Sequence, residues 1–219
     1  MANKLQVAII GLGRFGSNVA RTLFQSGHDV LGIDINEEKV QEMQGKITYA
    51  VQGDATQQVV LNELGVKDYN AAVVAIGDDL GQSITATVLL KSLEIPDVYS
   101  RSHSDIHKQT IEKLEATPIS VEEDMGSLIA YRMTKPNINE YMEISENFGI
   151  SQFKIGNEFK ERTLREIGIK TPRDKYSISI IAITHNEDIT MSPSLDTILH
   201  LGDIITVCGN DEDVGRFSN

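Results

Sequence analysis

The sequence contains one cysteine, no long hydrophobic run and fewer basic than acidic residues. One cysteine cannot close a disulfide within the chain, which excludes a disulfide framework and fits the cytoplasm. No apolar run approaches the ~20 residues that span a bilayer, and the first four residues lead into a strand pattern without the features of a signal peptide. With 32 acidic and 20 basic residues, the net charge of −12 opposes sequence-independent binding to nucleic-acid phosphates. We therefore expect a cytoplasmic globular protein with no nucleic-acid partner.

The first half of the chain alternates short apolar runs with amphipathic segments. At 219 residues, the chain can bury a sizeable core in one large domain or, as the better fit, two small ones. The alternation is typical of a parallel, doubly wound sheet. The expected strands are 5–10, 30–34, 48–51, 71–76 and 98–101, and the expected helices are 14–26, 36–44, 57–64, 80–93 and 105–115. Such a sheet binds its ligands beyond the carboxyl ends of the strands.

A glycine-rich turn directly follows the first apolar run. In this turn, Gly11 permits a tight bend, Gly13 lets a pyrophosphate approach the backbone, and Gly16 lets the next helix pack closely on the strand. The free N–H groups and the dipole of that helix favour an anion. The helical pattern of Phe15 and the apolar residues after it supports the same reading. The sequence therefore predicts a nucleotide site.

An acidic residue, Asp34, ends the second apolar run, roughly 20 residues after the glycines. Its carboxylate would accept hydrogen bonds from ribose hydroxyls and repel a 2′-phosphate, so we expect an adenosine nucleotide other than NADP. The alternative is that Asp34 caps the helix that starts near Asn36.

After Pro118 the pattern changes. Residues 122–135 place Met125, Leu128, Ile129 and Met133 on one face of a predicted helix. In an isolated chain this face is exposed unless a partner or the second domain covers it. Further on, we expect strands at 141–145, 152–155, 177–184 and 204–208, separated by breaks at Gly149, Gly156, Asn186 and Gly202, and short helices at 163–167 and 211–217. This predicts a smaller α+β domain.

Five pieces in this order resemble the RCK domain, the regulator of potassium conductance: 7–16, 32–40, 53–56, 75–79 and 122–126. The later pieces 181–185, 191–193 and 201–203 resemble the C-terminal lobe of the same family. The likeness covers nearly the whole chain, and it is greatest to the cytosolic gating subunits of Ktr and Trk potassium uptake systems. The resemblance implies a Rossmann-like domain at 1–121, a crossover and dimerisation helix at 122–136, and a C-terminal domain at 137–219.

The resemblance also implies how the site is used. ATP, ADP or NAD(H) would be bound, with Asp54 and Ala55 lining the adenine pocket and Gly77 and Asp78 near the ribose and phosphates. The expected nucleotide contacts are Gly11, Gly13, Arg14, Phe15, Gly16, Asp34, Asp54, Ala55, Ile76, Gly77, Asp78 and Arg101.

Three charged side chains carry particular hypotheses. Arg14, in the first turn of the helix, could reach a third phosphate that the backbone N–H groups cannot, or it could be a solvated surface arginine. Arg101 could meet phosphates or stack on adenine, or form an ion pair at the rim. By resemblance, Glu122 would help to hold a divalent or monovalent cation; alternatively the acids at 122–124 only complement the helix dipole.

By resemblance, the chain would form a homodimer that assembles into an octameric ring on the cytoplasmic face of the membrane and gates a potassium transporter. Arg173 and His185 would bind cyclic di-AMP in the C-terminal lobe; His185 could instead be a plain strand-end histidine. An NAD-dependent oxidoreductase is the alternative function, although it needs a general acid or base that only His103 is placed to supply. A free-standing nucleotide sensor is the third possibility.

Overall fold

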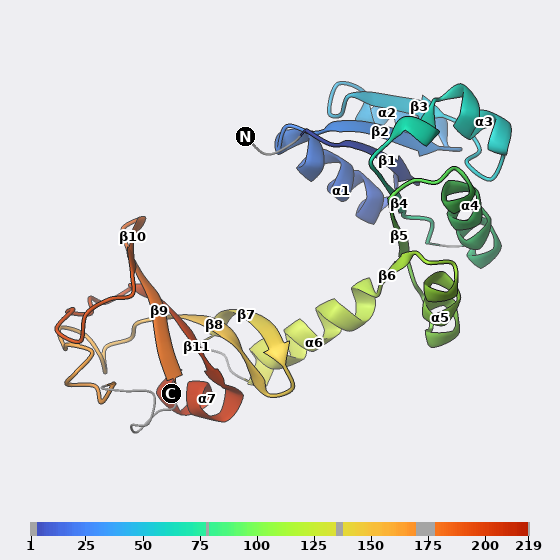
Figure 1. The fold of residues 1–219 in the computed structure, drawn as a ribbon. Helices are drawn as coiled ribbons and strands as arrows, with labels where there is room; N and C mark the ends of the chain where they lie inside the picture. Colours follow the sequence, from blue (N-terminus) through green and yellow to red (C-terminus); the bar gives the residue numbers. More distant parts are fainter. Residues whose placement is uncertain (1–3, 78, 135–137, 170–177, 219) are drawn as a thin grey trace. The chain divides into compact units, whose positions relative to one another are not determined.

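The computed structural model describes residues 4–77, 79–134, 138–169 and 178–218. The chain divides into two compact units, Met1–Glu123 and Asp124–Asn219. Each unit is built around its own sheet (Figure 1). Among the described residues, no helix combines the length and the apolar character needed to cross a lipid bilayer.

The first unit is a six-stranded sheet in the order β3-β2-β1-β4-β5-β6, with every strand pair parallel. Its strands are β1 (Gln6–Ile10), β2 (Asp29–Asp34), β3 (Tyr49–Gln52), β4 (Ala71–Val74), β5 (Asp97–Arg101) and β6 (Thr117–Ile119). Its α-helices are α1 (Arg14–Gln25), α2 (Glu37–Met43), α3 (Gln58–Glu63), α4 (Leu80–Ser92) and α5 (Asp105–Lys113). This strand order reverses between β1 and β4, which creates the crevice where doubly wound sheets bind ligands.

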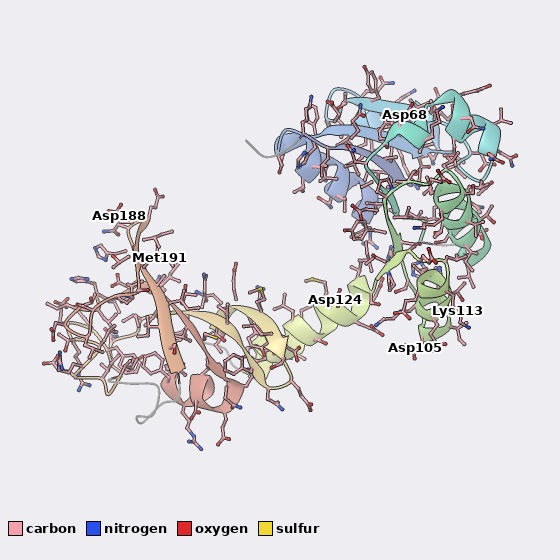
Figure 2. All side chains as sticks on the ribbon, viewed as in Figure 1. Asp68, Asp105, Lys113, Asp124, Asp188 and Met191 are labelled. Atoms are coloured by element: carbon pink, nitrogen blue, oxygen red, sulfur yellow. The ribbon has the colours of Figure 1, made fainter. Side chains whose placement is uncertain are left out.

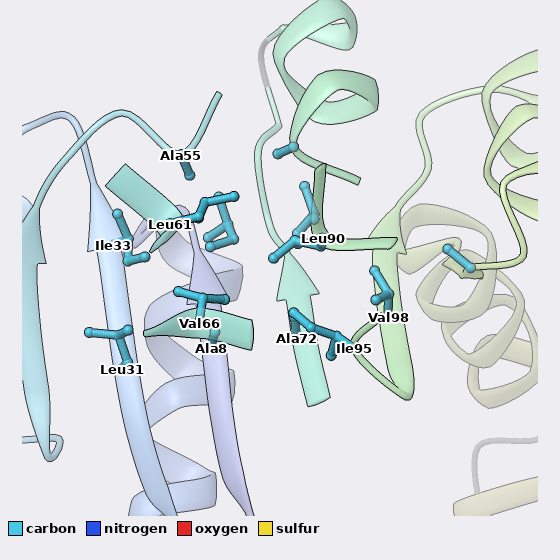
Figure 3. Close-up of a cluster of buried hydrophobic side chains, with 14 of the residues drawn as sticks. Ala8, Leu31, Ile33, Ala55, Leu61, Val66, Ala72, Leu90, Ile95 and Val98 are labelled. Carbon is cyan, nitrogen blue, oxygen red and sulfur yellow. The ribbon is translucent and has the colours of Figure 1, made fainter. Parts of the chain in front are cut away.

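Both faces of this sheet are covered, which explains why residues 7–10 of β1 are all apolar and buried. Ala8 and Ile10 belong to a core cluster with Leu61 of α3 and Leu90 of α4 (Figure 3). Val7 and Ile9 of β1 belong to a second cluster, which includes Ala20 of α1. The Rossmann-like α/β fold predicted from the alternation is therefore confirmed.

The second unit contains a five-stranded antiparallel sheet in the order β10-β9-β11-β8-β7. Its strands are β7 (Ile138–Ser145), β8 (Phe148–Lys154), β9 (Ile178–His185), β10 (Asp188–Met191) and β11 (Ile204–Asn210), and its C-terminal helix is α7 (Asp211–Ser218). Phe153 of β8 packs edge-on against Phe217 of α7, with ring centroids 5.2 Å apart, and both are fully buried. This aromatic contact joins the helix to the sheet and closes a separate core, so the predicted C-terminal α+β lobe is also confirmed.

Helix α6 (Val121–Thr134) connects the two units along the sequence. The predicted end of this helix at Pro136 lies outside the described residues. Met125, Ile129 and Met133 are 47%, 52% and 78% exposed, whereas Leu128 is partly buried. The first three follow one another at four-residue spacing and share a face.

Four details of the sequence-based prediction were wrong. The segment 163–167 is not a helix, because Leu164 and Arg165 donate their N–H groups to the carbonyls of Thr197 and Leu195 instead of continuing a helical ladder. Gly149 lies inside β8 rather than at a break; the chain turns at Asn147, whose φ is +60°. The predictions also omitted β6 and β10, which have only three and four residues.

Candidate nucleotide site

The carboxyl ends of the central strands open into a cavity of about 360 Å³, within the range of small-molecule sites. It is lined from four loops and the starts of α1, α2 and α4. The predicted residues on its wall are Gly11, Gly13, Arg14, Phe15, Asp34, Asp54, Ala55, Ile76, Gly77 and Arg101. Gly16 does not line the cavity but packs against Gly11 and Ala75, which do. Asp78 lies outside the described residues.

The three glycines at the turn from β1 to α1 have different steric environments. Gly11 has φ +95°, which favours glycine, and its N–H donates to the carbonyl of Ile33 at 2.8 Å. A Cβ on Gly16 would lie 1.9 Å from the Gly11 carbonyl oxygen and 2.9 Å from the Cβ of Ala75. A Cβ on Gly13 would meet nothing within 4 Å. The turn is thus tightly packed at Gly16, whereas Gly13 has open space where a side chain would be.

Helix α1 starts at this loop without a side-chain cap. Its N-cap is Gly13, and its first turn contains no acidic residue. The N–H groups at such a helix start have no intrahelical acceptor, and the helix dipole makes the position electropositive. The structure therefore presents an anion-binding helix end in the cavity wall.

Asp34 is 7% exposed, and its carboxylate holds two loops together. Oδ2 accepts from the N–H of Leu12 at 2.7 Å, and Oδ1 accepts from the N–H of Asn36 at 2.8 Å. Lys39 Nζ lies 3.7 Å from Oδ2. Asn36, rather than Asp34, caps α2 by accepting from Glu38 and Lys39, so the capping alternative for Asp34 is wrong.

The loop after β3 is fixed by Asp54. Its Oδ1 accepts from the hydroxyl of Thr56 at 2.6 Å and from the N–H of Thr56 at 2.9 Å. These hydrogen bonds, the hydroxyl first, lower the pKa of the Asp54 carboxyl below its usual value. Beside it, Ala55 is 6% exposed and presents a small apolar surface.

Arg101, at the end of β5, also lines the cavity. A Cβ on Gly77 would be 3.1 Å from its Nη1, so glycine leaves room there for the guanidinium. Nη2 of Arg101 forms an ion pair with Glu122 Oε1, and this hydrogen bond is the main cause that lowers the pKa of Glu122. Nε of Arg101 is buried and has no hydrogen-bond partner among the described residues.

Arg14 differs from Arg101 in its surroundings. It is exposed on the cavity rim, and among the described residues no carboxylate lies within ion-pair distance of it. Its positive charge is therefore available to a ligand.

Comparison with known proteins places this geometry in a family. Residues 7–121 match the TrkA-N domain model, and residues 152–219 match the TrkA-C domain model. The chain belongs to the TrkA family. This TrkA-family chain is 34% identical to Ktr system potassium uptake protein A of Bacillus subtilis (strain 168) over 215 residues, which covers 98% of the chain and 96% of the relative.

Solved structures show the same fold. The GsuK RCK domain superposes with a TM-score of 0.64 and 16% identity over 97% of the TrkA-family chain, which spans 46% of that longer chain. The GsuK channel bound to NAD gives a TM-score of 0.52 and 21% identity over 99% of the TrkA-family chain and 38% of that chain.

Lys39 and Gln82 are among the cavity-wall residues of this TrkA-family protein that were not predicted as nucleotide contacts. Lys39 lies in the first turn of α2, one turn beyond Asp34, and that spacing is the signal that could have found it. Gln82 donates to Asp79, the N-cap of α4, at 2.9 Å through its backbone and 3.1 Å through its side chain; only the cap could be expected from sequence.

His103 lies outside the main cavity and lines a second hollow with Lys108, Glu122 and Glu123. Its Nε2 lies 3.3 Å from the Ile76 carbonyl oxygen, and its ring is 5.6 Å from that of His107. His107 is 1% exposed, and its pKa is lowered by burial and then by the neighbouring His103.

In the TrkA-C part, His185 ends β9 and contacts Asp203, with its Nδ1 2.6 Å from Oδ1. Arg173 lies outside the described residues, so its predicted pairing with His185 around cyclic di-AMP stays a prediction.

Proposed function

We propose that this chain is the cytosolic regulatory subunit of a potassium uptake system of the Ktr or Trk type. It binds an adenine nucleotide, sits on the cytoplasmic face of the membrane and gates a membrane potassium transporter. The observation that carries the proposal is the uncapped start of α1, which opens into a cavity that also contains Asp34. The TrkA family match and the potassium uptake protein named above support the transport role.

The nucleotide contacts follow from the cavity wall. The phosphates bind the N–H groups of the Gly13 turn, and the ribose hydroxyls donate to the Asp34 carboxylate, whose oxygens keep lone pairs beyond the two backbone bonds. The adenine lies beside Ala55. A nucleotide fits this wall because Gly13 has open space above it and Arg101 adds a positively charged side chain to the lining.

Arg101 and Glu122 form a pair that a nucleotide with its cation can rearrange. Arg101 lies on the cavity wall, whereas Glu122 lines the neighbouring hollow. We assign the phosphates to Arg101 and a hard cation to Glu122, because carboxylate and phosphate oxygens suit such ions. Either role requires their ion pair to loosen.

A nucleotide gates the transporter only if it binds two states of the assembly with different affinities, because a ligand shifts an equilibrium by that difference in affinity. ATP must therefore favour one state more strongly than ADP or NADH does. Arg14 in the cavity wall is the candidate source of this difference in affinity, because a third phosphate can reach it and a second cannot.

We further propose that the chain forms a homodimer through α6, and that dimers build an octameric ring. The exposed face of Met125, Ile129 and Met133 supports this, since contiguous apolar surface marks interfaces. The proposed boundaries are 1–121, 122–136 and 137–219.

Placing a charge on this face should dissociate the dimer. Ile129→Asp buries a carboxylate in an apolar contact, which is costly. Light scattering should show the parent as a multimer and Ile129→Asp as a smaller species. The matched control is Ser127→Asp, which adds the same charge to an exposed position on another face of α6 and should leave the mass unchanged. A parent that is monomeric at micromolar concentration would contradict the ring.

A nucleotide should stabilise the parent against heat. At about 100 times its dissociation constant, a ligand that binds only the folded state adds ~2.7 kcal/mol, which for a chain of this size is a rise of about 5–11 °C in Tm. ATP, ADP and NADH are the probes, measured by thermal shift. Asp34→Asn should abolish most of the rise, because it removes the negative acceptor of the ribose while keeping one carbonyl oxygen for the loop.

The rise is taken against each variant's own Tm without ligand, because Asp34 also holds the loop. Asp29→Asn is the matched control: it makes the same change at the start of β2, where Asp29 pairs with Lys4 and does not line the cavity. The nucleotide assignment fails if no nucleotide shifts the parent, or if Asp34→Asn responds as fully as Asp29→Asn.

A further inference from the structure

We propose that the C-terminal unit contains a binding site for a divalent transition-metal ion, formed by His185, His200 and Asp203. Each residue offers one ligand atom, and these atoms all lie within 4.8 Å of one another. Two imidazoles and one carboxylate are a donor set that Zn²⁺ and its neighbours in the first transition row bind well. The site shares no residue with the cavity described above, so it is separate from the nucleotide site of the first unit.

Asp203 is the fixed member of the cluster. It is 3% exposed. Its backbone carbonyl accepts from Ile155 at 2.8 Å, and its side-chain Oδ2 accepts from the N–H of His200 at 2.8 Å. A buried carboxylate must be paired or bind a cation. The turn therefore holds one anionic ligand in place before any ion arrives.

The two imidazoles approach this carboxylate from different segments. His185 Nδ1 lies 2.6 Å from Oδ1, and His200 Nδ1 lies 3.5 Å from Oδ2. The ring centroids of the two histidines are 4.7 Å apart. The next residue before His200, Leu199, is fully buried and anchors that segment. Three donors from the end of β9 and from one turn thus converge on one point.

The spacing suits an ion after a small adjustment. Bond lengths of about 2.0–2.2 Å to Zn²⁺ place tetrahedral ligands about 3.4 Å apart. His200 Nδ1 lies close to this distance from Asp203 Oδ2, whereas His185 Nδ1 must move back from Asp203 Oδ1, its hydrogen-bond partner, by somewhat less than 1 Å. Both imidazoles can move, since their side chains are 49% and 47% exposed. Water would complete the coordination.

The bound ion would link the end of β9 to the turn before β11. These strands are already neighbours, with Thr184 opposite Ile204. The turn of the β9–β10 hairpin follows His185 directly, and Asp188, labelled in Figure 2, pairs with His185 next to that turn. The ion would therefore fix the turn end of this hairpin.

The test uses the full chain, freed of metal with a chelator and titrated calorimetrically with Zn²⁺. We expect one Zn²⁺ per chain in the parent. His185→Gln and His200→Gln should each weaken Zn²⁺ binding by at least about tenfold, because even substitution of residues that only hydrogen-bond to the metal ligands lowers affinity by that factor. Asp203 is left unchanged because its carboxylate also holds the turn. His28→Gln is the matched control in the other unit, where His28 accepts from Leu5 N–H, and should bind as the parent does.

Mg²⁺ separates a built site from general attraction to an acidic protein, because it prefers oxygen ligands. It should bind with the same weak affinity in all variants. The three substituted chains should keep the parent's Tm without metal, and the Zn²⁺-induced rise in Tm should be lost only in the two site variants. The proposal is overturned if the parent binds no Zn²⁺, or if both site variants bind it as tightly as His28→Gln.

Discussion

Gly16→Ala should destabilise the first unit and abolish nucleotide binding. The added methyl would stand 1.9 Å from the Gly11 carbonyl oxygen, which is backbone and cannot rotate away. Overpacking of this kind costs ~1–3 kcal/mol or more, and we expect the upper end, a fall of about 6–12 °C in Tm. Because the displaced backbone belongs to the turn between β1 and α1 that we propose binds the phosphates, the nucleotide-induced rise in Tm should disappear as well.

Gly13→Ala separates the two effects. Its methyl would have nothing within 4 Å, so Tm without ligand should stay near that of the parent. The same methyl would occupy the space where a phosphate meets the backbone, and nucleotide affinity should fall at least about tenfold, or ~1.4 kcal/mol. Thermal shift and calorimetry together check both variants. Full nucleotide affinity in Gly13→Ala would show that the phosphates bind elsewhere.

Arg14→Ala should remove the contribution of the third phosphate to nucleotide affinity. The N–H groups at the start of α1 can hold the first two phosphates, while a third projects past the turn toward the first helical side chain. A charge-assisted hydrogen bond there contributes ~1.5–3 kcal/mol. Affinity for ATP should therefore fall by about ten- to a hundredfold, with ADP and NADH nearly unchanged. Calorimetry with each ligand measures this.

The matched control is Arg21→Ala, on the same helix. Arg21 donates to Asn18 Oδ1 at 2.9 Å and does not line the cavity. Its loss should leave all three affinities as they are. Equal losses for ATP and ADP in Arg14→Ala would make Arg14 a general phosphate contact. Unchanged affinities would return it to a solvated surface arginine.

The first unit was predictable because its local signals agree with its fold. A strand that is buried on both faces is apolar along its buried length. A position as crowded as that of Gly16, next to the Gly11 carbonyl, has room only for glycine. Asp34 could be placed at the site because an acid at the end of the second strand meets the first loop in any sheet of this order. Its hydrogen bonds to Leu12 and Asn36, however, depend on loop conformations that no spacing encodes.

The contacts that sequence could not supply join distant segments. The ion pair that the sequence offered as the alternative for Arg101 is present, but its partner, Glu122, depends on how α6 leaves β6, which local pattern does not fix. In the C-terminal unit, short strands give little periodicity, and Thr163 pairs with the distant Ile198. The same holds for His200 and Asp203, whose approach to His185 only the sheet register brings about.

The most direct test of the account is potassium flux through a Ktr-type membrane subunit in proteoliposomes. The flux is measured without this protein, with it in ADP, and with it in ATP. We predict that flux with the protein differs between ATP and ADP, and that Arg14→Ala reduces the difference. Flux that is the same with and without the protein, in either nucleotide, would contradict the account.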